Sequence, residues 1–434
     1  MKHVLIISPS FPPLNTADCH RVRLSVPFFE EFGWKPTVLM VNPELNESSK
    51  DPLLVETVPD EIEVIQVGAM NPKWTRKVGL GSLGIRALPY MKKAGDKLLR
   101  RGDIDLVYFS TTMFPVTILG ARWKRKFKVP YIIDMQDPWH DDYHLTRPKS
   151  ERPKKFWFSH RLNKTLEPRA MRRVDGIISV SDKYSKTLQD RYSNIRPEMC
   201  DTIPFGASSR DFELLDRVTL DNEAFDPNDG MVHVVNTGSA GGHTMRFSFT
   251  VIFTALKKGL ETNPELFERI RMHFLGTTYA PNGTGANTVL PIAEKCGVGE
   301  YVHEQPDRLP YFNALKVLKD AAMLVIPGLD DPAYTASKLF PYILTRKQIL
   351  AVIHEGSSVV RMLDETRGGD CVPFNSDMDL DELATRAMKC WEEILGRLPA
   401  SPDTNWEAIE PHTAREMTRR QVECFERVLL ASAN

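Results

Sequence analysis

The chain has 434 residues, of which 42% are hydrophobic and 26% charged, and its formal net charge is −1. This composition is typical of globular proteins with sizeable cores, and the length predicts two domains. No apolar run approaches the roughly 18 residues that a membrane-spanning helix needs. The six cysteines include no CxxC pair, so they indicate neither a zinc site nor a disulfide framework. The segment 1–8 turns polar too soon for a secretory signal, and we expect a cytoplasmic protein.

The first half of the chain alternates short apolar strands with helical segments. The expected strands are 4–7, 37–41, 106–109, 131–134 and 176–180, and the expected helices are 17–32, 114–127 and 153–173. Such alternation predicts a parallel sheet covered by helices on both faces.

A polar, turn-rich stretch at 206–230 separates this half from a second one with the same pattern. The expected strands there are 231–236, 271–275, 301–303, 323–326 and 349–353, and the expected helices are 247–258, 339–344, 379–394 and 413–430. We therefore predict an α/β protein of two doubly wound, Rossmann-like domains, with ligands beyond the carboxyl ends of the strands. The predicted boundaries are 1–205 for the first domain, 206–230 for a linker, 231–410 for the second domain and 411–434 for a C-terminal helix.

The charge is unevenly distributed along the chain. The segment 71–173 holds 24 Lys and Arg against 9 Asp and Glu, a net charge of +15, so the remainder carries −16. A basic region of this size indicates either an anionic partner or a solvated surface, and the sequence leaves both open.

The first strand is followed by a loop of prolines and small polar residues, SPSFPPLNTA, from Ser8 to Ala17. A helix that begins at a strand exit offers free N–H groups to an anion or a polar ligand. The loop holds no GxGxxG pattern and no P-loop lysine, which excludes the usual dinucleotide and ATP fingerprints. An ordinary strand-to-helix connection explains it equally well.

An acidic and aromatic cluster, YIIDMQDPWHDDY, follows the expected strand 131–134. Carboxylates such as Asp137 could orient sugar hydroxyls, with the Trp139 ring on a sugar face. Alternatively, Asp137 caps a helix that begins at Pro138, and Trp139 is a core residue. His140 could take part in proton transfer, or it could be a structural residue.

Two segments of the second half suggest a phosphate site. The sequence NTGSAGGH ends the expected strand 231–236, and its glycines would let backbone N–H groups approach a ligand, with Arg246 nearby. In ASKLFPYILTRKQILAV, Ser337 and Lys338 come at the start of a helix. A lysine there opposes the helix dipole unless an anion is bound, so these residues favour a phosphate ligand over an arbitrary exposed lysine.

Together these segments resemble the GT-B-fold glycosyltransferases of the large, mostly retaining family 4 type. The most specific likeness is ASKLFPYILTRKQILAVIHEGS to the family pattern PSKLFEYLATGKPILALxPEGS. YIIDMQDPWHDDY is similar to DFRDPWTxDY, TIPFGASSRDF to xxPNGxDxxxF, and the first loop to PPxxGGxxxR. The glycine-rich segment resembles the family's xGxLYGGRxP stretch.

The resemblance implies a metal-independent, cofactor-free enzyme that transfers a sugar from a nucleotide-sugar, bound by the second domain, to an acceptor bound by the first across a cleft. It implies catalytic roles for Asp137, His140 and Lys338. The donor residues would be Gly238, Ser239, Arg246, Ser337, Lys338 and Leu339. The acceptor residues would be Asn15, Thr16, Asp137 and Trp139, and the C-terminal helix would pack back on the first domain.

The chain departs from the family pattern at several positions. Pro341 replaces the glutamate that grips the nucleotide ribose, Asn15-Thr16 replaces a Gly-Gly pair, and Gln136 replaces an arginine. Glu355 and Asp364 are candidate replacements for the glutamate by sequence proximity.

Three alternatives to a transferase follow from these departures and from the charge. They are a GT-B epimerase or hydrolase, a catalytically silent nucleotide-sugar-binding protein, and a nucleic-acid-binding protein, for which the sequence offers no recognition module. For the basic region 71–173, with Trp74 and Trp157, we expect an anionic membrane surface as partner, which would place the protein on the inner face of the plasma membrane.

Overall fold

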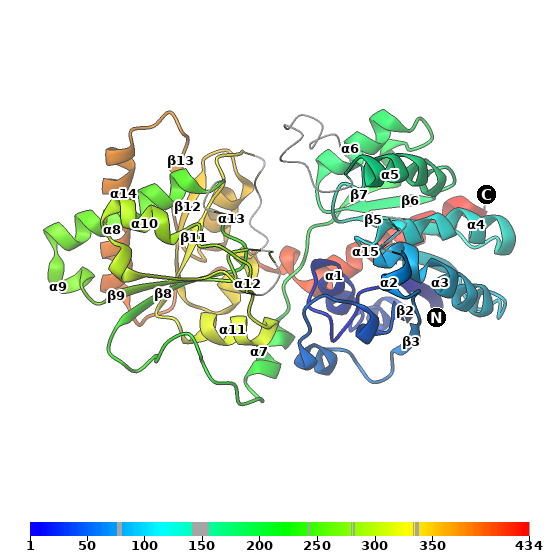
Figure 1. The fold of residues 1–434 in the computed structure, drawn as a ribbon, viewed down its shortest axis with the longest axis horizontal. Helices are drawn as coiled ribbons and strands as arrows, with labels where there is room; N and C mark the ends of the chain where they lie inside the picture. Colours follow the sequence, from blue (N-terminus) through cyan, green and yellow to red (C-terminus); the bar gives the residue numbers. More distant parts are fainter. Residues whose placement is uncertain are drawn as a thin grey trace. The chain divides into compact units, whose positions relative to one another are not determined.

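A computed structural model describes residues 1–75, 80–140, 156–241, 244–278, 280, 283–332, 334 and 338–433. The chain forms two compact units (Figure 1). Unit 1 comprises residues 1–206 and 412–434, and unit 2 comprises residues 207–411. None of the helices in the described ranges is long and apolar enough to cross a bilayer.

Unit 1 is built on a seven-stranded parallel sheet in the order β3-β2-β1-β4-β5-β6-β7. Its strands are β1 (Lys2–Ile7), β2 (Trp34–Val41), β3 (Glu63–Val67), β4 (Leu106–Ser110), β5 (Tyr131–Met135), β6 (Gly176–Ser179) and β7 (Cys200–Thr202). Its helices are α1 (Ala17–Ser25), α2 (Pro72–Thr75), α3 (Leu83–Leu99), α4 (Ile118–Phe127), α5 (Phe156–Met171), α6 (Asp182–Arg191) and α15 (Ala414–Ala433).

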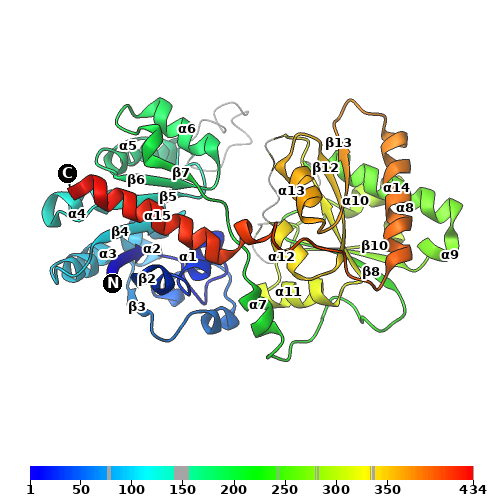
Figure 2. The same cartoon turned by 180° about the vertical axis from the view of Figure 1, so that it is seen from behind.

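The two faces of this sheet carry separate cores. One core packs α3, α4 and α5 against the strands, and the other packs α1 and α15. Figure 2 shows α15 lying along unit 1, where the Phe425 ring meets Trp34 at 5.3 Å and Tyr108 at 5.1 Å between centroids. The C-terminal helix is therefore an integral part of unit 1.

Unit 2 is built on a six-stranded parallel sheet in the order β10-β9-β8-β11-β12-β13. Its strands are β8 (Val232–Thr237), β9 (Ile270–Leu275), β10 (Val302–Gln305), β11 (Met323–Pro327), β12 (Gln348–His354) and β13 (Asp370–Phe374). Its helices are α7 (Ser209–Leu215), α8 (Arg246–Thr262), α9 (Pro264–Phe267), α10 (Leu290–Cys296), α11 (Tyr311–Asp320), α12 (Leu339–Leu344), α13 (Ser358–Thr366) and α14 (Leu380–Arg397).

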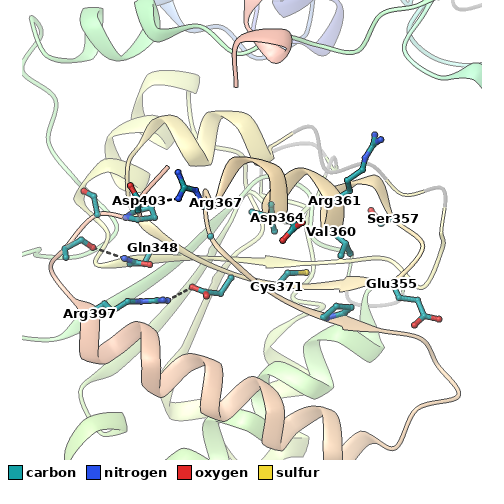
Figure 3. A pocket seen from close by; sticks show the side chains of 17 residues that line it. Gln348, Glu355, Ser357, Val360, Arg361, Asp364, Arg367, Cys371, Arg397 and Asp403 are labelled. Atoms are coloured by element: carbon teal, nitrogen blue, oxygen red, sulfur yellow. Dashed lines mark hydrogen bonds and ion pairs between the residues drawn. The ribbon is translucent and has the colours of Figure 1, made fainter. Parts of the chain in front are cut away.

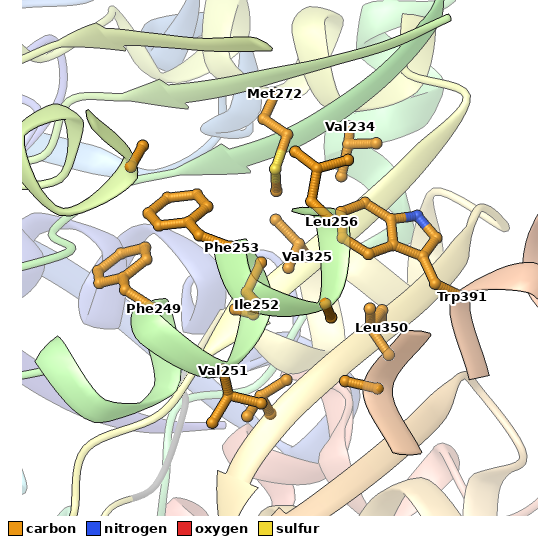
Figure 4. Packing of buried hydrophobic residues seen from close by; sticks show 14 of the residues in the cluster. Val234, Phe249, Val251, Ile252, Phe253, Leu256, Met272, Val325, Leu350 and Trp391 are labelled. Atoms are coloured by element: carbon orange, nitrogen blue, oxygen red, sulfur yellow. The ribbon is translucent and has the colours of Figure 1, made fainter. Parts of the chain in front are cut away.

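The largest core of unit 2 lies under α8, whose buried stripe faces the strands (Figure 4). Phe249 and Phe253 meet the Phe274 ring of β9 edge to face, at 5.3 and 5.9 Å. Trp391 of α14 closes the other side and donates its indole N–H to Met323 Sδ at 3.2 Å. The packing of these rings holds α8 against the sheet, and this positions the loop between β8 and α8.

The predicted fold class is confirmed: both units are doubly wound α/β layers. Several element boundaries were wrong. The predicted helix 17–32 ends at Ser25, because Pro27 cannot continue a helix, and only a short 3-10 turn, Glu30–Phe32, follows. The predicted linker 206–230 contains α7 and lies in unit 2 from Ala207 on.

Each sheet reverses its strand order once, between β1 and β4 in unit 1 and between β8 and β11 in unit 2. In open parallel sheets, ligands bind beyond the carboxyl ends of the strands at such a reversal. The loops after β1, β4, β8 and β11 are therefore the expected positions of a ligand.

Candidate functional site

In unit 2, the loop after β8 meets the residue that precedes α12. Lys338 is the N-cap residue of α12, one position before the first helical turn in which the sequence placed it. Its ammonium lies 3.1 Å from the carbonyl oxygen of Thr237, 3.4 Å from that of Ser239 and 3.4 Å from Asn236 Oδ1. Ser337 lies outside the described residues, so its predicted contact stays a prediction.

All of these oxygens are neutral, and no carboxylate within the described ranges forms an ion pair with Lys338. Part of the side chain is exposed, but the ammonium lies within the loop, and its burial lowers the pKa of Lys338 from 10.5 to about 8. The second cause of the lowered pKa is the nearby charge of Arg308. A bound anion would favour the charged form of Lys338, which burial and the charge of Arg308 both disfavour.

Arg308 was not among the predicted site residues. It follows β10, and its Cα lies 3.4 Å from the point where a Cβ on Gly276 would stand. Gly276, directly after β9, lies in turn beside Gly238, whose backbone N is 3.8 Å from the same point. An arginine at the exit of a neighbouring strand is the sequence signal that could have identified it.

Two glycines shape this region through their backbone conformation. Gly238 has φ +89° and Gly276 has φ +74°, in the left-handed range that side chains disfavour. A Cβ on Gly238 would also point at the Lys338 ammonium, 3.9 Å away. Glycine at these exits leaves the space beside the two cations open.

Tyr342 of α12 locks the lysine-bearing helix to β8. Its hydroxyl accepts the Thr237 N–H at 2.7 Å and donates to the Thr237 carbonyl at 3.2 Å. Pro341 stands in the first turn of α12, where a missing N–H breaks no intrahelical hydrogen bond. The proline therefore leaves the fold intact and removes only the carboxylate of the family pattern.

Of the other predicted donor residues, some are exposed at the surface and some are buried in the core. Arg246, the first residue of α8, is exposed and has no side-chain partner among the described residues, so it is free to bind an anion. Leu339 is fully buried, which leaves only its backbone for a ligand. Ser239 contributes its carbonyl to Lys338.

The two candidate replacements for the family glutamate lie in different surroundings. Glu355 directly follows β12 and accepts a hydrogen bond from Asn375 Nδ2 at 2.8 Å. Two residues on, Ser357 Oγ donates to the carbonyl of Tyr334 at 2.6 Å, which ties this loop to the segment after β11. Glu355 and Asp364 are both exposed, and Glu355 differs only in that its loop is tied to the segment after β11.

A cavity of about 980 Å³ runs along the edge strand β13 (Figure 3). Its wall includes Glu355, Asp364, Arg367 and Arg397, but neither Lys338 nor Gly238. Arg397 pairs there with Asp370, and Arg367 with Asp403 at 3.0 Å. Because its arginines are already neutralised, this cavity is a weaker anion site than the loop around Lys338.

In unit 1, a buried carboxylate ties together the loops after β1 and β4. Asp18, in the first turn of α1, accepts hydrogen bonds from Thr16 Oγ1 at 2.7 Å and from Thr111 Oγ1 at 3.1 Å. The Thr112 N–H adds a third at 3.3 Å. Asn15 Oδ1 contacts His20 Nε2 at 2.9 Å. Asp18 thus fixes Thr16 beside the β4 exit, and His20 of the same helix holds Asn15.

Asp137, after β5, is accessible to solvent, yet partial burial and then the negative charge of Asp18 raise its pKa. Asp137 in turn helps raise the pKa of Tyr184, after burial as the first cause. Asp137 therefore lies near enough to the Asp18 loop for the two carboxylates to interact, and its role toward an acceptor stays a prediction. Asp18, Thr111 and Tyr184 were missed, because single polar residues at strand exits leave no motif.

Trp139 and His140 both contact other side chains of unit 1, whereas the sequence suggested that they contact a sugar. Trp139 is only 6% exposed and stacks on Phe114 at 5.4 Å between ring centroids, which favours the core alternative over a sugar platform. His140 Nε2 lies 3.2 Å from His160 Nε2 of α5. A ligand contact by either residue stays a prediction.

A fully buried ion pair between Arg21 and Asp134 holds the elements of this site together. Arg21 donates to Asp134 at 2.9 Å and to the carbonyls of Ile203 and Pro204 at 2.7 and 2.9 Å. Asp134 also accepts from Tyr108 Oη at 2.8 Å. The pair links α1, β4, β5 and the end of the first half of the chain, so it holds the β5 exit and Asp137 in place.

Two doubly wound, parallel α/β units in one chain are the architecture of the GT-B fold. Three solved structures share it at low sequence identity. Anabaena Alr3699/HepE in complex with UDP-glucose has a TM-score of 0.58 at 12% identity, covering 98% of this chain and 100% of that one. A glycosyltransferase from Rickettsia africae ESF-5 has a TM-score of 0.56 at 14% identity, covering 99% and 98%. A UDP-forming α,α-trehalose-phosphate synthase from Burkholderia xenovorans has a TM-score of 0.58 at 11% identity, covering 99% of both chains.

Residues 50–208 match the sequence model of the family described as Glycosyltransferase Family 4. No curated protein sequence matches the chain. The resemblance to GT-B glycosyltransferases of family 4 type, predicted from the motifs, is confirmed for the fold and for this segment.

Proposed function

We propose that the protein is a glycosyltransferase that moves a sugar from a nucleoside diphosphate sugar to a hydroxyl of a glycan, lipid-linked or small-molecule acceptor. One observation carries the proposal: Lys338, beside the loop after β8 at the strand reversal of unit 2, contacts only neutral oxygens among the described residues. A diphosphate fits this charge, and the relative Alr3699/HepE, of the same fold, was solved with UDP and with UDP-glucose.

In the proposed reaction, the bond from the sugar C1 to the diphosphate oxygen breaks and a bond from C1 to the acceptor oxygen forms on the same face. The acceptor proton passes to the departing phosphate, so configuration is retained without a metal or cofactor. Lys338, Arg308 and Ser337 stabilise the charge that grows on the leaving diphosphate. Asp137 orients the acceptor hydroxyl, and His140 is a secondary candidate for proton transfer.

Pro341 favours one alternative, a nucleotide-sugar-binding protein without turnover, because the ribose-gripping carboxylate is missing. Under the transferase proposal, Glu355 takes over that contact from the β12 exit, next to the loop that Ser357 ties to Tyr334. A GT-B epimerase or hydrolase would instead consume the donor with no acceptor present.

We also propose that the enzyme is cytoplasmic and that its basic region 71–173 binds an anionic membrane surface. The described helices give no transmembrane anchor, so such an association would be peripheral.

A thermal-shift panel of UDP, GDP, ADP, TDP and CMP tests the donor proposal. A ligand at 100 times its dissociation constant adds about 2.7 kcal/mol to the unfolding free energy, a shift of several degrees. We expect one diphosphate to shift wild type but not Lys338→Met, and the exposed Lys257→Met to behave as wild type. Turnover of the matching nucleotide-sugar only when acceptor is added then separates a transferase from a hydrolase or a silent binder. No shift from any nucleotide would overturn the proposal.

A further inference from the structure

The folded structure gathers a dense group of basic residues of unit 1 at one end of its sheet. The second half of α3, the second half of α4 and the end of α5 carry this group, in the segments 92–101, 122–128 and 169–173. These segments hold 13 Lys and Arg and a single acidic residue, Asp96. Each helix ends shortly before the strand that follows it, β4, β5 or β6, and parallel strands begin at the same edge. We call this set the amino-end basic face.

Figures 1 and 2 show α3 and α4 extending toward the same edge of the sheet as the start of β1. The candidate acceptor residues follow the carboxyl ends of β1 and β5, at the opposite edge. The amino-end basic face is therefore separate from the proposed site in unit 1.

Asp96 holds part of this charge in place. It is 5% exposed, accepts the Trp123 indole N–H at 2.8 Å and faces three cations: Lys126 at 3.2 Å, Arg122 at 3.7 Å and Lys92 at 4.0 Å. One carboxylate cannot neutralise three cations, so the α3–α4 junction keeps a positive excess. The arrangement fixes cations of two helices beside each other.

Most of the remaining cations have no acidic partner. Eight are exposed and form no ion pair within the described part of the chain: Lys93, Lys97, Arg100, Arg125, Lys128, Arg169, Arg172 and Arg173. Basic residues in the last turn of a helix also complement its dipole, but each helix end carries only about half a negative charge. Three helix ends therefore account for a small part of the excess.

The exposed aromatic residues lie elsewhere. Trp74 is 71% exposed and Trp157 is 69% exposed. Trp74 belongs to α2, after β3, and Trp157 to the first turn of α5, after β5, so both follow the carboxyl ends of strands. Trp74 and Trp157 therefore lie on other elements than the amino-end basic face, and several of the cations next to them in the sequence lie outside the described residues, so the predicted aromatic and basic interface stays a prediction.

We propose that the amino-end basic face docks unit 1 on an anionic lipid bilayer through electrostatics alone. Each Lys or Arg near an anionic surface contributes about the same increment to binding, so a row of cations from three helices suits a continuous anionic plane. Base-stacking aromatic side chains, which nucleic-acid grooves use, are absent from the three segments apart from the buried Trp123 and the half-buried Phe127.

Co-sedimentation with vesicles of equimolar phosphatidylglycerol and phosphatidylcholine tests the proposal, with pure phosphatidylcholine vesicles as reference and without any donor present. The test variant replaces four exposed, unpaired cations of the face: Lys93→Gln, Lys97→Gln, Arg100→Gln and Arg125→Gln. The matched control removes four exposed cations from unit 2: Lys257→Gln, Lys295→Gln, Arg386→Gln and Lys389→Gln. A third variant combines Trp74→Ala with Trp157→Ala.

We expect wild type to bind only the anionic vesicles, with a loss of tenfold or more in the test variant, and little change in the other two. Equal losses in the test and control variants, or a loss confined to the tryptophan variant, would overturn the assignment of the face. So would salt-dependent binding to RNA or DNA that is tighter than vesicle binding. An unchanged melting temperature shows that the test variant is folded, and its retained nucleotide-induced shift separates docking from donor binding.

Discussion

Replacing Lys338 by methionine is the perturbation that most sharply distinguishes a phosphate site from a structural lysine. Methionine keeps the unbranched stem and removes the ammonium that contacts Thr237, Ser239 and Asn236. A hydrogen bond to a charged group is worth about 1.5–3 kcal/mol, so we expect the dissociation constant of the nucleoside diphosphate to rise about 10- to 150-fold. Isothermal titration calorimetry measures this, with Lys257→Met as the control.

The pH dependence of binding gives a second, independent signature. Free Lys338 has a pKa of about 8, and a bound diphosphate requires the protonated form. Binding should therefore weaken about tenfold between pH 7 and pH 9 in wild type, because above pH 8 a proton must be taken up on binding. In Lys338→Met this part of the pH dependence should vanish.

As pH rises above 8, the unfolding free energy should increase while the affinity for nucleotide decreases. The folded pKa of about 8 lies below the ordinary 10.5, so the unfolded chain binds more protons between these values and the unfolding free energy rises with pH there. Below pH 8 the cost of burying the charge is fully present. Without ligand at pH 7, Lys338→Met should therefore be more stable than wild type, by up to about 3 kcal/mol. A variant that binds nucleotide as tightly as wild type, or that is strongly destabilised, would refute the phosphate assignment.

Three further predictions concern the backbone and unit 1. Gly238→Ala forces an alanine into φ +89° and points a methyl group at Lys338, so it should cost about 1–3 kcal/mol in urea denaturation and weaken nucleotide binding; an unchanged midpoint would contradict this. Arg21→Met leaves Asp134 buried without its cation and should cost about 3–5 kcal/mol, partly recovered when Asp134→Asn is added; equal loss in single and double variants would exclude the ion-pair explanation. Asp137 has a raised pKa, and its ionised form accepts a hydrogen bond from a hydroxyl more strongly than its protonated form, so transfer should fall as pH drops through that pKa, and Asp137→Asn should lower kcat and flatten this limb; an unchanged pH–rate profile would remove Asp137 from the site.

Much of the fold was predictable because apolar strands buried on both faces leave continuous runs, as in Val4–Ile7 and Met323–Ile326. The missed elements lack that signal. Edge strand β3 alternates half-buried and exposed residues, β7 has only three residues, and α3 carries Pro89 within its span. Their positions depend on tertiary packing, which local patterns do not record.

Only those residues of the candidate donor site that belong to a recognisable motif could be predicted from the sequence. Lys338 and Gly238 lie together as their segments suggested, because both follow strands at the sheet reversal. Arg308 was missed because its loop joins the site only through the neighbouring positions of β8, β9 and β10 in the sheet. Trp139 shows the converse: its motif is conspicuous, yet the ring fills the core beside Phe114.

A crystal structure of the protein with the nucleoside diphosphate selected by the thermal-shift panel tests the central claim most directly. We predict density for the two phosphates beside Lys338 Nζ and the Arg308 guanidinium, next to Gly238. Density for the nucleotide in the cavity along β13, with Lys338 still bound only to Thr237, Ser239 and Asn236, would contradict it.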